Sequence, residues 1–346
     1  MAALRRVVAA DEVHPGCATC FEREARGIYS HRQRLNHEFG ATARDGSAAL
    51  VSLDLRFSNL CNQRCRMCCP SASSKIGQEQ GGPESSLSYA FTDFDSCRQQ
   101  VEPLLPALRH VYFAGGEPLI MPEHAAFLRW LLDRGRADIR LGYNTNLSRL
   151  DAGKEGTVLD LWRQFARVEV EVSVDGVGAV GELIRKDMSW PVVSANLRAV
   201  QQTCPAVRLC YGVTAQVLNV FHLPELVRCL TTEFGAGPHD WRVLPLTWPE
   251  CYAVTVLPSV LKDEAARRLL ACAEKHDVAV AADETGAFHP RPPVGEQLRV
   301  VRAFMLARDT SEQLPGLRER TNELDRCRHE ATCQVVPELS AVLVVD

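Results

Sequence analysis

The stretch that decides the fold is 53-LDLRFSNLCNQRCRMCCP-70. Apolar and polar residues alternate at its start, which predicts a β-strand, and the chain then enters a loop with Cys61, Cys65 and Cys68. Three thiolates at CxxxCxxC spacing can hold three irons of a cubane iron–sulfur cluster and leave the fourth iron without a protein ligand. Such an iron can coordinate a substrate or cosubstrate, whereas a cluster with four cysteines only carries electrons.

A second motif is needed, because 14 cysteines in 346 residues can produce this spacing by chance. Residues 111–119, VYFAGGEPL, predict an apolar strand that runs into Gly115, Gly116, Glu117 and Pro118. Two glycines let the backbone pass close to a ligand, and the carboxylate can accept hydrogen bonds from an ammonium group. The two motifs together resemble the radical S-adenosylmethionine (SAM) superfamily, in which a GGEP strand holds the methionine amine. The resemblance implies a [4Fe–4S] cluster and SAM as cofactors.

A third similarity concerns the N-terminal segment, where a CxxC precedes a helix predicted over 21–36. This segment resembles the one just before the core of bacterial and phage twitch-domain radical SAM proteins. The residues that carry the resemblance are Cys17, Cys20, Glu24, Gly27, Ser30, Arg32 and Asn36. The similarity runs on through ordered motifs to the tail, where Leu324, Asp325 and the triplet at 337–339 fit the same family.

The totals indicate a globular protein of ordinary composition. A length of 346 residues predicts about two domains or one large α/β barrel, and a net charge of −4 gives no reason to expect nucleic-acid binding. No window approaches about 18 uninterrupted apolar residues, so no membrane span is expected. The first residues lack the apolar stretch of a signal peptide, and the many cysteines therefore indicate reduced thiols in the cytoplasm, several of them bound to iron.

The remaining pattern alternates helices and strands, which is typical of βα units around a parallel sheet. Strands are predicted near 51–57, 110–114, 138–144, 168–174, 207–214 and 241–246. Helices are predicted over 95–108, 122–135, 157–166, 192–203, 222–234, 259–276 and 293–307. Six such units agree with the partial (β/α)6 TIM-like barrel that the resemblance implies. Residues 253–257 predict a further short strand, and the polar residues 71–90 predict a mobile loop that could act as a substrate lid.

This pattern divides the chain into three segments. We expect an N-terminal accessory segment with the CxxC at 1–50, a radical SAM core at 51–250, and a twitch-like accessory region at 251–346.

Polar side chains follow the successive strands, and in barrels of parallel strands the reactive residues gather at these carboxyl ends. Ser173 and Asp175 can hydrogen-bond the ribose hydroxyls of SAM, although Asp175 with Gly176 also fits a simple turn. Asn144 and Asn146 flank Thr145 and read as SAM-site residues or as strand-end caps.

Three further positions are assigned by resemblance to the family or by their place after a strand. Arg185 lies where the family has an arginine that pairs with the SAM carboxylate, with a solvated helix arginine as the alternative. Met67 lies where many members carry an aromatic residue that packs on adenine, a role that a thioether can fill. Asn219 lies just past the fifth predicted strand and is either a turn or a site residue.

The other cysteines leave several readings open. The twitch resemblance implies an auxiliary iron–sulfur cluster, to which Cys17 and Cys20 would contribute, and Cys327 and Cys333 are candidates for its remaining ligands. A structural zinc knuckle and free thiols are the alternatives. Cys251 follows the sixth predicted strand and could return a hydrogen atom to a substrate radical, although a buried or ligating thiol is also consistent with its position.

The resemblance implies one type of reaction. SAM chelates the open iron, an electron splits its S–C5′ bond, and the resulting 5′-deoxyadenosyl radical abstracts hydrogen from a substrate. We expect a peptide or protein substrate that is epimerised, crosslinked or similarly modified, and an electron donor such as flavodoxin or ferredoxin. The alternatives are the same chemistry on a small-molecule biosynthetic intermediate and a non-catalytic iron–sulfur or zinc module, against which the ammonium and ribose motifs argue.

Overall fold

The computed structural model describes residues 7, 12–25, 30, 32–33, 36, 39, 49–81, 87–277 and 291–344. The chain forms two compact units, one of residues 1–51 with 104–108, and one of residues 52–103 with 109–346. In the first, a short 3-10 helix (Pro15–Cys17) leads into α2 (Ala18–Ala25). Of the helix predicted over 21–36, residues 26–29, 31, 34 and 35 lie outside the described residues, Gly27 among them.

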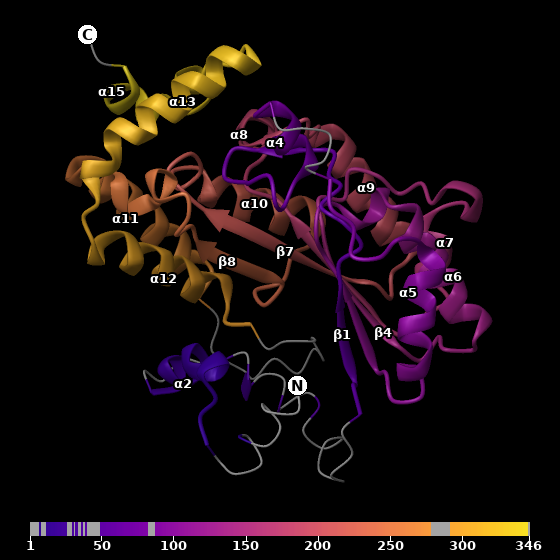
Figure 1. Cartoon of the computed structure of the whole chain (residues 1–346). Coiled ribbons are helices and arrows are strands. Elements are labelled where there is room, and N and C mark those ends of the chain that lie inside the picture. Colours follow the sequence, from indigo (N-terminus) through magenta and orange to yellow (C-terminus); the bar gives the residue numbers. More distant parts are fainter. Residues whose placement is uncertain are drawn as a thin grey trace. The chain divides into compact units, whose positions relative to one another are not determined.

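Six parallel strands form the sheet of the larger unit, in the order β1-β3-β4-β5-β7-β8 (Figure 1). Their bounds are β1 Ser52–Leu55, β3 His110–Phe113, β4 Arg140–Thr145, β5 Val168–Ser173, β7 Arg208–Ala215 and β8 Trp241–Pro245. Every neighbouring pair is parallel. The predicted α/β fold with six parallel strands is therefore confirmed, and it is consistent with a partial TIM barrel.

Helices connect these strands and extend beyond them to the C-terminus (Figure 1). They are α4 Ser74–Glu79, α5 Phe94–Val101, α6 Pro122–Asp133, α7 Val158–Trp162, α8 Gly178–Ile184, α9 Trp190–Thr203, α10 Leu223–Phe234, α11 Ser259–Lys275, α12 Val294–Ala307, α13 Leu314–Arg328, α14 Thr332–Val335 and α15 Ser340–Leu343. A separate two-stranded antiparallel ribbon joins β2 (Arg64–Cys65) to β6 (Arg185–Lys186). None of the helices in the described part of the chain is long and apolar enough to cross a membrane.

Two sequence predictions about loops and strands are wrong. The strand expected at 253–257 is a 3-10 helix (Val254–Val256), because the edge of β8 is already covered by α12. Gln297 of α12 accepts a hydrogen bond from the Val243 amide (2.7 Å) and donates one to the Trp241 carbonyl (2.9 Å). These bonds take up backbone groups on the outer edge of β8 that a seventh strand would need.

The loop expected over 71–90 is not a continuous mobile lid, since α4 occupies 74–79 and Tyr89 pairs with Ser58. The Ser73 hydroxyl donates to the Gln63 carbonyl (3.0 Å), and Ile76 is buried. Polar composition misled the prediction because these serines serve the cysteine loop instead of solvent. Residues 82–86 of the predicted lid lie outside the described residues.

The two faces of the sheet differ in polarity, as β5 illustrates. Val168, Val170 and Val172 are buried on one face, and Glu169 and Glu171 alternate with them on the other. The glutamates are buried as well, which requires compensation of their charge.

Arg291 provides much of this compensation on the polar face. One of its guanidinium nitrogens, Nη2, lies 2.9 Å from Glu169 and 3.3 Å from Glu171. Gly212 makes room on β7, because a Cβ there would lie 2.8 Å from the Glu171 carboxylate. The polar face is thus built around a buried ion-pair group instead of an apolar core.

The apolar face carries an aromatic cluster that includes a histidine, His124. Its ring lies edge-on to Phe113 and its Nε2 is 3.0 Å from the Tyr143 hydroxyl. Burial lowers the pKa of His124 to about 3. An unfolded histidine titrates near 6.5, so between these pH values the unfolded chain binds one more proton than the folded chain, and stability falls as pH falls.

We therefore expect the free energy of unfolding to decrease by up to about 1.4 kcal/mol per pH unit below pH 6.5 on account of this residue. The measurement is urea unfolding at pH 7.5, 6.0 and 5.0 for the wild type and His124→Gln. The variant should show a shallower pH dependence than the wild type. Parallel curves for the two proteins would contradict a buried neutral imidazole.

Candidate functional site

The cysteine loop is closed on itself by backbone and side-chain hydrogen bonds. Asn59 donates to the Pro70 carbonyl (3.0 Å), which ties the beginning of the loop to its end. The Cys61 amide donates to the Ser74 hydroxyl (3.2 Å), and the Cys68 amide donates to the Cys65 carbonyl (3.0 Å). The loop therefore has a defined shape that presents its three thiols from a short segment.

The three thiols lie in one neighbourhood and are partly shielded from solvent. Burial raises the pKa of Cys65 to about 12 and of Cys68 to about 11, with smaller contributions from the neighbouring thiols. Burial also raises the pKa of Cys61. These thiols are thus protonated without a metal, and iron would displace their protons on binding. The thiol of Cys69 is turned toward the Ser71 hydroxyl, 3.1 Å away.

The donor set of three thiols fits an iron–sulfur cluster, whose irons are held by cysteine thiolates. Among the residues that the structure describes, no three His, Cys, Asp or Glu side chains converge as the ligands of one metal ion. Cysteines of a cubane each bind a different iron, so they stand farther apart than the ligands of a zinc site. Cys61, Cys65 and Cys68 would hold such a cluster through three irons.

The glycines of the GGEP motif lie against the backbone of the cysteine loop. Gly115 and Gly116 have φ angles of 81° and 52°. A Cβ on Gly116 would lie 2.0 Å from the Leu60 carbonyl oxygen, so any side chain there would displace the loop. The Glu117 amide donates to this same oxygen (2.7 Å). The close approach that the sequence suggested is thus made here to the cysteine loop itself.

Glu117 is buried and its carboxylate accepts three hydrogen bonds from the protein. Its Oε1 accepts from the Leu119 amide (3.0 Å) and the Thr145 hydroxyl (2.6 Å), and its Oε2 accepts from the Asn146 amide (2.6 Å). Burial raises its pKa and these bonds oppose the rise. Pro118 follows as the first residue of a 3-10 helix (Pro118–Ile120). Glu117 therefore joins the ends of β3 and β4, and Oε2 retains capacity for another donor.

The asparagines at the end of β4 have different environments. The Asn146 side chain donates to Asn62 of the cysteine loop (2.9 Å), and Asn62 donates to the Ser148 hydroxyl (2.7 Å). Asn144 is half-buried on the polar face of the sheet, where its Oδ1 lies 3.5 Å from Arg242. Asn146 thus supports the cysteine loop, whereas Asn144 lies near Arg242 on the polar face of the sheet.

A buried ion pair connects the end of β5 to the second cysteine. Asp175 is fully buried and its Oδ2 lies 2.8 Å from Arg185 Nε. Arg185 in turn places Nη1 3.7 Å from the Cys65 sulfur. Burial raises the pKa of Asp175, and Arg185 and the Thr214 amide oppose the rise. Asp175 therefore positions Arg185 beside a candidate cluster ligand.

The loop after β7 is held by Asn219, whose side chain bonds only to backbone. Its Nδ2 donates to the Asp175 and Thr214 carbonyls (both 2.9 Å), and its Oδ1 accepts from the Gln216 amide (2.8 Å). Asn219 thus links the ends of β5 and β7, and its amide hydrogens are both used. Ser173 is half-buried at the end of β5.

The remaining sequence candidates lie in other elements. Cys251 is half-buried in a 3-10 helix (Glu250–Tyr252) beside α13, where burial raises its pKa against the opposing charge of Arg320. Cys327 is exposed on α13, and Cys333 is half-buried in α14. Cys17 and Cys20 belong to the compact unit of residues 1–51 with 104–108. A shared auxiliary cluster stays a prediction.

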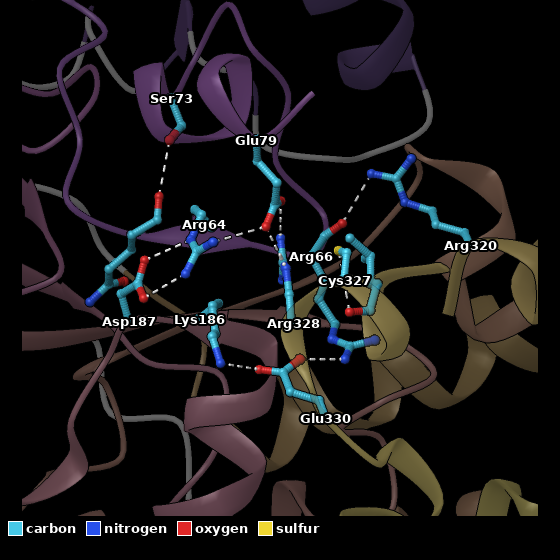
Figure 2. Close-up of polar contacts among 12 residues, drawn as sticks. Arg64, Arg66, Ser73, Glu79, Lys186, Asp187, Arg320, Cys327, Arg328 and Glu330 are labelled. Atoms are coloured by element: carbon cyan, nitrogen blue, oxygen red, sulfur yellow. Dashed lines mark hydrogen bonds and ion pairs between the residues drawn. The ribbon is translucent and has the colours of Figure 1, made fainter. Parts of the chain in front are cut away.

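Sequence reasoning missed the charged and amide residues of the loop itself, Gln63, Arg64 and Arg66. Arg64 and Arg66 flank Cys65 and form ion pairs, as Figure 2 shows. Sequence reasoning also missed Gln216, which donates to the Met67 sulfur (3.7 Å) and has a buried Oε1 with no partner among the described residues. The Arg–Cys–Arg alternation was a readable signal, because in an extended chain alternate side chains point to opposite faces.

Comparison with protein families matches residues 55–214 to the family described as the radical SAM superfamily. Comparison with curated proteins gives no match.

Solved structures with a similar chain trace include native anSMEcpe with bound AdoMet and Kp18Cys peptide, at 17% identity and a TM-score of 0.45, over 65% of this chain and 60% of that chain. Another is Streptococcus suis SuiB bound to precursor peptide SuiA, at 13% identity and a TM-score of 0.39, over 63% of this chain and 50% of that chain. A third is TYW1 with a lysine-pyruvate adduct bound, at 12% identity and a TM-score of 0.36, over 70% of this chain and 78% of that chain. This chain thus spans about 60% of the first of these proteins.

Proposed function

We propose that this chain, a radical SAM superfamily enzyme, modifies a peptide or protein. The modification would begin with abstraction of a hydrogen atom from the substrate. The superfamily implies a [4Fe–4S] cluster and S-adenosylmethionine as cofactors. When bound, these supply a 5′-deoxyadenosyl radical by reductive cleavage of SAM.

The residues of this chain would divide the work of holding the cofactors. Cys61, Cys65 and Cys68 would bind the cluster. The open acceptor position on Glu117 Oε2 would receive the methionine ammonium, and Arg185 would face its carboxylate while remaining paired with Asp175. Each of these groups is buried or half-buried, which strengthens its electrostatic interactions by excluding water.

The nucleoside part of SAM would lie at the ends of β5 and β7. We assign Ser173 and Asn144 to this region, because both are polar residues at strand ends that are only half-buried. Met67 would pack on the adenine, and the unpartnered Oε1 of Gln216 beside it would accept a hydrogen bond from the adenine amino group. Burying an acceptor without a hydrogen bond costs free energy, and a donor on a bound ligand would remove this cost.

The observation that carries the proposal is the convergence on Cys65. Its loop contacts the GGEP turn, the end of β4 and the Asp175–Arg185 pair, which are separate motifs of the sequence. A simple electron-carrying or zinc-binding module has no use for a buried arginine and a buried carboxylate aimed at the same loop.

The choice of a peptide or protein substrate rests on the resemblance of the CxxC segment and the tail to twitch-domain proteins. The same resemblance supports an auxiliary cluster that includes Cys17 and Cys20, with Cys327 and Cys333 as further candidate ligands. Cys251 stays a candidate hydrogen-atom donor by its place after β8, and burial raises the pKa of its thiol.

The test is anaerobic reconstitution with iron and sulfide, followed by dithionite and SAM. We expect 5′-deoxyadenosine to form, and its rate to increase when the correct peptide is added. No 5′-deoxyadenosine from a fully loaded protein would favour a binding module. Stimulation by a small metabolite and by no peptide would favour the small-molecule alternative.

A further inference from the structure

The β2–β6 ribbon has two faces with different neighbours. In its register Cys65 pairs with Arg185, and Arg64 pairs with Lys186. Side chains alternate along each strand, so Cys65 and Arg185 share one face, and Arg64 and Lys186 share the other. Figure 2 shows the second face, which meets α4 and the C-terminal segment that contains α13. We call these the cluster face and the rear face.

Arg66 extends the rear face and is the most buried charge in this region. Its side chain is 0% exposed, and Nη2 lies 2.5 Å from Asp325 and 2.6 Å from Glu330. Glu330 also binds Lys186 at 2.9 Å. These four residues carry two positive and two negative charges and form a neutral group. Asp325, which also accepts from the amide and hydroxyl of Thr332, is fixed within the tail.

A second neutral group lies beside the first. Arg64 makes two contacts with Asp187 (2.8 and 2.9 Å) and one with Glu79 of α4 (3.1 Å). Glu79 accepts a bidentate pair from Arg328 of α13 (2.9 and 2.6 Å). Burial would raise the pKa of Glu79, but the two arginines hold it below its usual value. The two residues that flank Cys65 are therefore both anchored through ion pairs.

Stability alone does not account for a buried arginine at this place. Replacing a buried ion pair by apolar side chains is often neutral or stabilising, because the charges lose their hydration. What an arginine held by two carboxylates does provide is a fixed position and direction. The Arg66 carbonyl is held as well, since Arg320 of α13 donates to it (3.2 Å). Side chain and backbone of the residue after Cys65 are thus both bound by the tail.

We propose that Asp325 and Glu330 are positioning residues for the cluster site. By holding Arg66 on the rear face, they fix the Cys65 sulfur and its neighbour Arg185 on the cluster face, so the C-terminal segment determines how firmly the cluster is retained and how SAM meets it. This inference rests on the proposed function for its consequence, but its structural part concerns the chain alone.

The test uses Asp325→Asn/Glu330→Gln, which leaves Arg66 buried without a countercharge. Glu338→Gln is the matched control, because Glu338 is also a tail carboxylate paired with an arginine, Arg268 (2.8 Å), and has a similar exposure of 17% against 12% for Glu330. In the reconstituted full-length proteins, we expect a chelator to remove iron about 10- to 100-fold faster from the double variant than from the control, the range typical for partners of metal ligands. We also expect the SAM-induced change of the reduced cluster's electron paramagnetic resonance spectrum to be diminished.

Equal iron release and an equal SAM response in the double variant and the control would overturn the proposal. If the double variant does not fold, Glu330→Gln alone decides, since Asp325 still compensates Arg66 in it. Faster iron release from this single variant than from Glu338→Gln supports the proposal, and equal release overturns it.

Hydrogen–deuterium exchange separates this inference from the proposed function. In the metal-free proteins, amides of residues 61–68 should exchange faster in Glu330→Gln than in Glu338→Gln. Wild-type protein that binds no cluster would defeat the proposed function and leave this comparison valid. If the wild type responds to SAM but amides 61–68 exchange equally fast in Glu330→Gln and Glu338→Gln, only the positioning role is defeated.

Discussion

Joint replacement of Cys61, Cys65 and Cys68 by alanine is expected to remove about four iron atoms per chain and to abolish 5′-deoxyadenosine formation. The reason is that these three thiols are the proposed ligands of the cluster. Cys69 is the nearest alternative, and its sulfur contacts Ser71. The measurements are iron and sulfide content after reconstitution, together with product formation under dithionite and SAM.

Cys69→Ala is the matched control for this variant. It removes a neighbouring half-buried thiol from the same loop, and we expect it to retain both iron and activity. Loss of iron in this control equal to that in the triple variant would contradict the assignment of the three ligands.

Iron that remains in the triple variant has a separate meaning. A residual cluster would be the auxiliary one, and substitution of Cys17 and Cys20 or of Cys327 and Cys333 would then show which pair holds it. A triple variant free of iron would end the auxiliary-cluster hypothesis. Electron paramagnetic resonance of the wild type would count the clusters independently.

Asp175→Asn is expected to lower the free energy of unfolding by about 3–5 kcal/mol, the usual cost of leaving one partner of a buried pair uncompensated. Arg185 is 11% exposed in its side chain, and Asp175 is 0% exposed. The asparagine Oδ1 can still accept from the Thr214 amide, but its NH2 group then faces Arg185 in place of Oδ2, so the variant removes both the charge and the acceptor of the pair. Urea unfolding of the metal-free protein at neutral pH measures the change.

The control is Asp151→Asn, which removes the same charge from a pair that water screens. Asp151 and its partner Arg149 are both 55% exposed, and surface pairs that water screens contribute little to stability. If Asp175→Asn destabilised the protein no more than this control, Arg185 would not depend on Asp175 for its charge compensation. Its position beside Cys65 would then need another explanation.

The parts of the candidate site differ in how far the sequence could predict them. The cysteine loop and the GGEP turn were predictable, because both lie next to strands with a clear apolar pattern and carry residues of special chemistry. The roles of Glu117 and Asn219 were not, since their hydrogen-bond partners come from other strand ends. The sequence named these residues as candidates, and the structure adds that their groups bond largely to the protein.

The failed loop and strand predictions have the same origin. The serines near 73 read as solvent-exposed polar residues, but Gln63 and Cys61 use them as hydrogen-bond partners. Residues 253–257 read as a strand, but Gln297 of α12 already covers the sheet edge. In both cases hydrogen-bond partners outside the local pattern determined the outcome, and that pattern carries no information about them.

The sequence by itself determined the six-stranded parallel sheet, the placement of three cysteines after its first strand, and the class of chemistry that such a loop permits. Strand and helix periods are local properties, and ligand chemistry belongs to residue types. Only the tertiary structure decided which charges meet. Arg66 pairs with Asp325, 259 residues later in the chain, and Cys65 faces Arg185, 120 residues away. Such pairs depend on which loops reach the same place, and the buried charges there are tolerated only because the whole fold brings their partners to them.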